Sequence, residues 1–275
     1  MRQLIVDTSC ELNDNMIDQM ELCYVPFVIT MGNRVFVDDL NLDMEDFFHT
    51  MKNTNDTIRT ACPSPDDFYR VMKGDEIFVI TITSKLSGTY SSAMIAKQMY
   101  LEENPNAKVH VFDSASAVSG ESGIALFIND LAKEGKEFEE IVRETEEMMK
   151  RSVTVIALSS LTNLARNGRM PKFAGKLSRV LNIKLIARAK DGKILPISIE
   201  KGVKRTINTV VEKCKNLCDM TLKCQIVISH ANQIDMAEAI KAKISEIFPS
   251  RKINITGMKG LSSTYAEEGG IVVFL

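Results

Sequence analysis

Short apolar runs alternate with amphipathic stretches through roughly the first 150 residues of the chain. Residues 4–6, 76–82 and 108–112 are mostly apolar, and polar residues follow each run. Apolar runs of this length are typical of strands that are buried on both faces of a sheet. Between them lie stretches in which apolar residues recur every three or four positions, which predicts helices. These stretches are residues 43–53, 88–104, 120–135 and 137–151.

Alternating strands and helices predict an α/β fold with a mostly parallel sheet and helices on both of its faces. Within the first 150 residues, one segment instead favours an antiparallel pair of strands. Residues 23–30 and 34–39 both read as short strands, and Gly32-Asn33 between them is a hairpin turn signal.

The second half of the chain has a different pattern. A strand at residues 152–160 precedes a helical stretch at 161–181, and two antiparallel strands are expected around the turn Asp191-Gly192. We therefore predict two domains, an N-terminal α/β domain at 1–151 and a mixed α/β domain at 152–275. The other elements expected in the second domain are helices at 203–217 and 233–248 and strands at 224–231, 252–259 and 269–275.

Composition and charge narrow the function classes. The 275 residues are 45% apolar and 25% charged, which is ordinary for a globular protein, and the net charge of -2 argues against nucleic acid as a partner. No apolar run is long enough to span a membrane, and Asp7 interrupts the N-terminal apolar run too early for a secretion signal. We expect a cytoplasmic protein.

The six cysteines do not form a recognisable metal or redox motif. Cys214 and Cys218 are four residues apart on an expected helix, and Cys224 opens the next strand. A second pair of ligands at zinc-binding spacing is absent. Reduced cysteines that act as small apolar residues are the better interpretation.

Hydroxyl side chains crowd the stretch ITSKLSGTYSSA at residues 82–93, where a predicted strand turns into a predicted helix. The first turn of a helix has unpaired backbone N–H groups and the positive end of the helix dipole. Ser87 and Thr89 add hydroxyl donors there, which favours a site for a phosphate or a carboxylate. Simple N-capping of the helix is an equally good interpretation. The stretch matches neither a P-loop nor a dinucleotide-binding loop.

A hydrolase that uses Ser87 as its nucleophile is a second hypothesis. Such an enzyme needs a general base within hydrogen-bond distance of the serine. His230, at the end of a strand in the second domain, is the most plausible base among the three histidines. We expect the two residues to lie far apart, in different domains.

Several motifs in order along the chain resemble the DegV family of bacterial lipid-binding proteins. ITSKLSGTYSSA is similar to the family pattern Ile-Ser-Ser-x-Leu-Ser-Gly-Thr-Tyr-x-Ser-Ala, and the resemblance runs nearly end to end. It implies a two-domain α/β fold that buries a long-chain fatty acid in a tunnel, with the acid as bound ligand and no cofactor. The other matching stretches are VDTSCEL, VPFVI, RTACPSP, DSASAVSGESG, LTNLARNGRM and LNIKLIARAKDGKILP.

The resemblance also implies which residues bind the carboxylate. Hydroxyls from a Thr-Ser-x-Pro loop and from the Leu-Ser-Gly-Thr turn hold it in the family. The chain departs from the family near its C-terminus, where Tyr265 stands at the position of a family histidine, and Glu267 and Glu268 replace Gly-Pro. A tyrosine hydroxyl can also donate to a carboxylate. The predicted ligand-binding residues are Thr60, Ala61 (a serine in the family), Ser84, Ser87, Gly88, Thr89, Thr264 and Tyr265.

The family resemblance further implies a partner. A separate ATP-dependent kinase subunit would phosphorylate the bound acid to an acyl-phosphate, so the chain itself would be a carrier and not an enzyme. Arg169 and Arg205 are the predicted partner contacts, although Arg169 can equally pair with a carboxylate between domains. The alternative is a DegV-type binder of another lipid or acid without a kinase role. Transient contact with a membrane is compatible with either.

Overall fold

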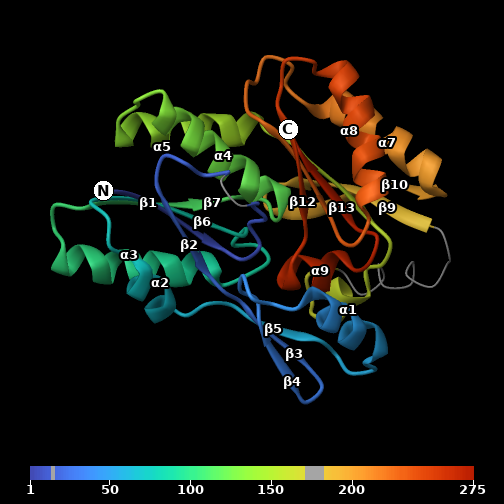
Figure 1. Cartoon of the computed structure of the whole chain (residues 1–275), viewed down its shortest axis with the longest axis horizontal. Helices are drawn as coiled ribbons and strands as arrows, with labels where there is room; N and C mark the ends of the chain where they lie inside the picture. The colour runs from blue at the N-terminus through green and yellow to red at the C-terminus, as the bar shows by residue number, and fades with distance from the viewer. Residues whose placement is uncertain (14–15, 171–182) are drawn as a thin grey trace.

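The computed structural model describes residues 1–13, 16–170 and 183–275. Within these ranges the N-terminal half contains a parallel four-stranded sheet, as the apolar runs predicted. Its two central strands have almost no exposed residues, because helices cover both faces (Figure 1). In spatial order the strands are β2 (Glu21–Val25), β1 (Arg2–Asp7), β6 (Glu76–Thr81) and β7 (Lys108–Asp113).

Helices lie on both faces of this sheet. In Figure 1, α4 and α5 lie above it and α2 and α3 lie below it. Alternate residues of β1 point to opposite layers, so Leu4 and Val6 pack against α4 while Ile5 packs against α2 and α3. The bounds are α2 Pro65–Val71, α3 Thr89–Glu103, α4 Ser119–Lys133 and α5 Phe138–Arg151.

A small antiparallel sheet stands beside the parallel one. The predicted hairpin at Gly32-Asn33 is confirmed, since β3 (Val28–Met31) pairs antiparallel with β4 (Arg34–Val37). The prediction of one strand over residues 23–30 was wrong, because the chain leaves the parallel sheet at Pro26, which lies between β2 and β3. The structure adds β5 (Arg59–Ala61), which pairs with β3, and α1 (Met44–Asn53), which was predicted.

The C-terminal half forms a mixed sheet, which confirms the fold class. Helices α7 (Val203–Leu217) and α8 (Ile234–Ile247) cover one face, and the opposite face points toward the N-terminal half (Figure 1). Only β11 and β12 pair in parallel among the strands described. The order is β10 (Lys193–Lys201), β9 (Ile183–Lys190), β8 (Thr154–Leu158), β13 (Ile271–Phe274), β11 (Ile226–His230) and β12 (Ile253–Gly257).

Helix α4 joins the two halves. Its buried residues pack against the N-terminal sheet and also against Phe274 of β13, so one apolar cluster includes residues of both halves. The predicted boundary at residue 151 falls at the end of α5 and stays a prediction.

Two short helices differ from the sequence prediction. The helix expected over 161–181 is present as α6 (Thr162–Arg166) and ends before Gly168, which has a φ of 73°. The part of that prediction after residue 170 lies outside the described residues. Helix α9 (Gly260–Ala266) was not predicted.

Candidate functional site

A cavity of about 830 Å³, including its open mouth, lies between the two halves. One side consists of loops at the carboxyl ends of β1, β6 and β7, which contribute Ser9, Thr83 and Ser116. Ligands commonly bind at these ends in open parallel sheets.

The other side of the cavity is the free face of the C-terminal sheet. Thr154, Ile156 and Leu158 alternate along β8 and all line the cavity, while Val155 and Ala157 between them pack against the helices of the opposite face. The period of two along a strand thus separates the cavity wall from the core. Helix α9 completes the enclosure with Leu261, Ser262, Tyr265 and Ala266.

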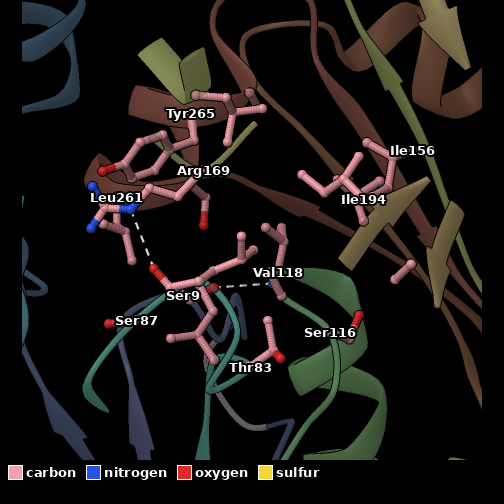
Figure 2. A pocket seen from close by; sticks show the side chains of 18 of the residues that line it. Ser9, Thr83, Ser87, Ser116, Val118, Ile156, Arg169, Ile194, Leu261 and Tyr265 are labelled. Atoms are coloured by element: carbon pink, nitrogen blue, oxygen red, sulfur yellow. Dashed lines mark hydrogen bonds between the residues drawn. The ribbon is translucent and has the colours of Figure 1, made fainter. Parts of the chain in front are cut away.

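Polar groups gather at one end of this largely apolar space. The hydroxyl groups of Thr60 and Tyr265 are 2.7 Å apart and share a hydrogen bond, which joins β5 to α9. Ser87 lines the same end, and its hydroxyl lies 2.7 Å from that of Thr89. Figure 2 shows Tyr265, Arg169 and Ser87 on one side of the cavity.

Arg169 belongs to the cavity wall. Its Nη1 donates to the carbonyl of Asn167 at 2.7 Å and its Nε to the carbonyl of Leu86 at 3.3 Å. Its guanidinium lies 5.9 Å from the centre of the Tyr265 ring, within the range of a cation–π contact. Three hydroxyls and one permanent cation therefore surround the polar end, an arrangement suited to an anion.

Six predicted site residues do not line the cavity. The Thr264 hydroxyl donates to the carbonyl of Gly260 within its own helix, and the backbone N–H of Ser84 donates to Asp113. Thr89 acts indirectly, through its contact with Ser87. Gly88 is the N-cap of α3, while Ala61 on β5 and Arg205 in the first turn of α7 are exposed.

Glu267 and Glu268 also lie outside the cavity wall. A carboxylate oxygen of Glu267 accepts a hydrogen bond from the backbone N–H of Asn163, and one of Glu268 accepts from the side chain of Asn232. The two carboxylates that replace Gly-Pro are thus engaged elsewhere, and none of the described residues that line the cavity is acidic.

The contacts of Ser87 and His230 do not provide the pair that a serine hydrolase requires. The Ser87 hydroxyl is hydrogen-bonded to Thr89, whereas Nδ1 of His230 accepts from the backbone N–H of Gln233. His230 does not line the cavity. Within the described residues, no three histidine, cysteine or acidic side chains are arranged to hold a metal ion.

Two buried acidic side chains hold the helix that carries Tyr265. Asp38 accepts hydrogen bonds from the backbone N–H groups of Gly260 and Leu261, each at 2.8 Å, and Glu11 accepts from that of Lys259 at 2.7 Å. They satisfy N–H groups that every helix start leaves unpaired. Burial raises the pKa of Asp38 to about 6, and burial together with the charge of Asp38 raises the pKa of Glu11 to about 8.

A second pair of buried acids lies beneath the cavity wall. Asp7 accepts from the backbone N–H groups of Ser9 and Ile82, both of which line the cavity. The nearby carboxyl of Glu121 is fully buried without a hydrogen bond of normal geometry to any described residue. Burial, with the charge of Asp7, raises the pKa of Glu121 well above its usual range, so this side chain keeps its proton.

Replacing Glu11 with glutamine is expected to flatten the pH dependence of stability. Its pKa is about 8 in the folded protein and near 4.5 when unfolded, so the folded state holds a proton that the unfolded state releases between these values. The free energy of unfolding therefore falls as pH rises through this window, by on the order of 2 kcal/mol between pH 6 and 8. Glutamine keeps the oxygen that accepts from Lys259 and removes the titration. Chemical denaturation at both pH values would measure the slopes, and equal slopes for the variant and the wild type would contradict the assignment.

The fold and the cavity define a class of protein: two α/β lobes that enclose a largely apolar space with hydroxyl groups and a guanidinium at one end. A model of the "DegV family", described as uncharacterised proteins, matches residues 2–275. The chain belongs to the DegV family, as its motifs indicated. None of the helices in the described ranges is long and apolar enough to cross a membrane.

Relatives and solved structures cover the chain almost completely. A DegV domain-containing protein of Streptococcus pneumoniae is 32% identical over an alignment 280 positions long, which covers 98% of this chain and 97% of the relative. A DegV family protein of Eubacterium eligens, solved loaded with heptadecanoic acid, is 32% identical with a TM-score of 0.94 and covers 100% and 99% of the two chains. The Fatty Acid Kinase (Fak) B3 protein of S. pneumoniae, loaded with linoleic acid, is 32% identical with a TM-score of 0.94 over 100% and 98%.

Proposed function

We propose that this protein binds one long-chain fatty acid, with the carboxylate at Thr60, Ser87, Tyr265 and Arg169 and the tail in the apolar cavity. One observation carries the proposal: three hydroxyls and a guanidinium gather at one end of a cavity whose remaining walls are mainly apolar. A carboxylate removed from water needs such donors, because burying it without them is very costly. A neutral apolar ligand would leave these groups unused.

The tail supplies the affinity in this proposal. Burial of each methylene contributes about 0.8 kcal/mol, so a chain of about fifteen methylenes contributes roughly 12 kcal/mol before the cost of association is subtracted. The hydrogen bonds to the head group add to this affinity and fix the orientation of the acid. The two solved relatives that hold heptadecanoic and linoleic acid support the same ligand class here.

Tyr265 takes the role of the family histidine in this proposal. Its hydroxyl already lies 2.7 Å from that of Thr60, so the pair would present two hydroxyls to one carboxylate oxygen or to both. A tyrosine donates without a change of charge near neutral pH. The substitution would therefore preserve the donor and remove a group that titrates in the physiological range.

We further propose that the protein presents the carboxylate of the bound acid to a kinase. Fak B3, by its name, is part of a fatty acid kinase, and it shares 32% of its sequence with this chain. An ATP-dependent partner in the cytoplasm would then form the acyl-phosphate, and the carrier would reload at a membrane by transient contact. Lys204 and Arg205, exposed at the start of α7, are the proposed partner contacts. A DegV binder without a kinase role is the second candidate.

Denaturing extraction of the purified protein, followed by mass spectrometry of the organic phase, tests the proposed ligand. We expect about one fatty acid per chain, and we expect the double variant Thr60→Ala, Ser87→Ala to lose most of it. The variant Ser91→Ala is the matched control, because Ser91 lies in the same stretch but not in the cavity wall. The absence of lipid, with none taken up when fatty acids are supplied, would refute the carrier function.

The kinase role needs its own experiment. Protein loaded with fatty acid would be incubated with ATP and a purified bacterial fatty acid kinase subunit, and acyl-phosphate would be trapped with hydroxylamine. We expect hydroxamate only when both proteins are present, and a several-fold loss with Lys204→Ala, Arg205→Ala at unchanged lipid content. Full lipid binding without hydroxamate would favour the second candidate.

A further inference from the structure

The end of the cavity opposite Tyr265 consists of a row of residues across three strands. Thr154 on β8 is paired with Ala189 on β9, and Ala189 is paired with Ile194 on β10. Paired residues of neighbouring strands point to the same face of a sheet, and all three line the cavity. Figure 2 shows Ser116, Ile156 and Ile194 on the side of the cavity away from Tyr265 and Arg169.

The turn between β9 and β10 closes this end against the N-terminal half. Asp191 and Gly192 have φ values of 51° and 74°, as a tight two-residue hairpin requires. A Cβ atom at Gly192 would lie 2.3 Å from Oγ1 of Thr83 and 2.8 Å from Cγ of Lys85. The hairpin tip therefore lies directly on the loop after β6.

Two hydroxyl groups at this end are already paired with each other, and Lys193 beside Ile194 also lines the cavity. The hydroxyls of Ser116 and Thr154 share a hydrogen bond of 2.9 Å, and both residues are buried. The two hydroxyls satisfy each other and do not require a polar ligand group. A methyl terminus is the chemistry that fits here.

We propose, on the basis of the fatty acid function proposed above, that the β9–β10 hairpin stops the tail and that Ala189 and Ile194 set the longest chain accepted. Because the side chain of Ala189 is a single methyl group, a larger residue at this position would shorten the part of the cavity that is available to the acyl chain. Removing the outer carbons of Ile194 lengthens it. Burial of one methylene changes affinity about fourfold, so a shift by two methylenes changes the preference between chain lengths about tenfold or more.

Three variants test this assignment. Ala189→Leu is expected to favour acids about two carbons shorter than the wild type does, and Ile194→Ala acids about two carbons longer. Ile197→Ala is the matched control, because Ile197 lies on the same strand but is 37% exposed and does not line the cavity. Competition among saturated acids of even chain length, read by mass spectrometry of the bound fraction, would give the preferences, and thermal unfolding would confirm that each variant is folded.

The outcomes separate this inference from the function on which it depends. Opposite shifts for Ala189→Leu and Ile194→Ala, with none for Ile197→Ala, would support it. Unchanged chain-length preference in folded variants that bind fatty acid would overturn it and leave the carrier function intact. Failure of the wild type to bind any fatty acid would refute both.

Discussion

Replacing Arg169 with glutamine is expected to raise the Kd for a long-chain fatty acid about 10- to 100-fold, because hydrogen bonds to a charged group contribute about 1.5–3 kcal/mol. The guanidinium lies 5.9 Å from the centre of the Tyr265 ring, and it lines the cavity together with Ser87. Glutamine keeps a hydrogen-bond donor on a shorter side chain but removes the positive charge. Titration of delipidated protein with a fatty acid would measure the change.

Arg166→Gln is the control for this substitution, since Arg166 lies on α6 close in sequence but is exposed to solvent. Its Kd should equal that of the wild type. The sequence alone left partner binding and pairing with a carboxylate equally open for Arg169, and the same pair of variants tests the partner hypothesis. If Arg169→Gln retains full affinity but abolishes acyl-phosphate formation with a kinase, Arg169 acts at the partner surface and the proposed carboxylate site lacks its cation.

The parts of the fold that the sequence predicted are those set by local pattern. Residues 77–80 of strand β6 are an uninterrupted apolar run, and their burial follows from that pattern without any knowledge of the neighbouring strands. The hydroxyl-rich stretch before α3 likewise marked one wall of the cavity, because its position after a strand and before a helix is legible in the sequence. Ser87 lines the cavity for this reason.

The elements that were not predicted depend on contacts between distant segments. Strand β5 has three residues, too few for a periodic pattern, and it exists because β3 offers a free edge. Helix α9 contains Gly260 and several hydroxyl residues, which disfavour a helix in isolation. It forms where Asp38, 222 residues earlier, accepts from its first N–H groups. Such a capping group cannot be identified from the sequence around the helix.

The cavity wall opposite Tyr265 also could not be predicted in full from the sequence. The sequence predicted the hairpin at Asp191-Gly192 from its turn residues, and pairing of β9 with β10 confirms it. The sequence did not indicate that Ala189 and Ile194 face a cavity, because that depends on which face of the C-terminal sheet the N-terminal half covers. Residue pattern defines the two faces of a strand, and tertiary packing decides what each face meets.

The substitution Gly123→Ala is expected to destabilise the protein by about 2–4 kcal/mol, because overpacking a tightly packed core commonly costs more than the gain in helix propensity. A Cβ atom at this position of α4 would lie 2.0 Å from Cδ1 of Phe274 and 2.1 Å from its Cε1. The ring is 1% exposed and cannot rotate away without displacing the core shared by the two halves. For a chain of this size the midpoint of thermal unfolding should fall by roughly 5–10 °C.

A second substitution distinguishes this clash from a general intolerance of alanine. Phe274→Leu removes the ring, so the double variant Gly123→Ala, Phe274→Leu should be more stable than the sum of the two single effects predicts. Gly257→Ala is the matched control, because no atom of the described residues lies within 4 Å of a Cβ there, and we expect a change within about 0.5 kcal/mol. Thermal and chemical unfolding of all four variants would give the coupling energy. If the two single effects are strictly additive, the cost of Gly123→Ala does not come from a clash with the Phe274 ring. That result would contradict the proposal that this tight contact holds the two halves together.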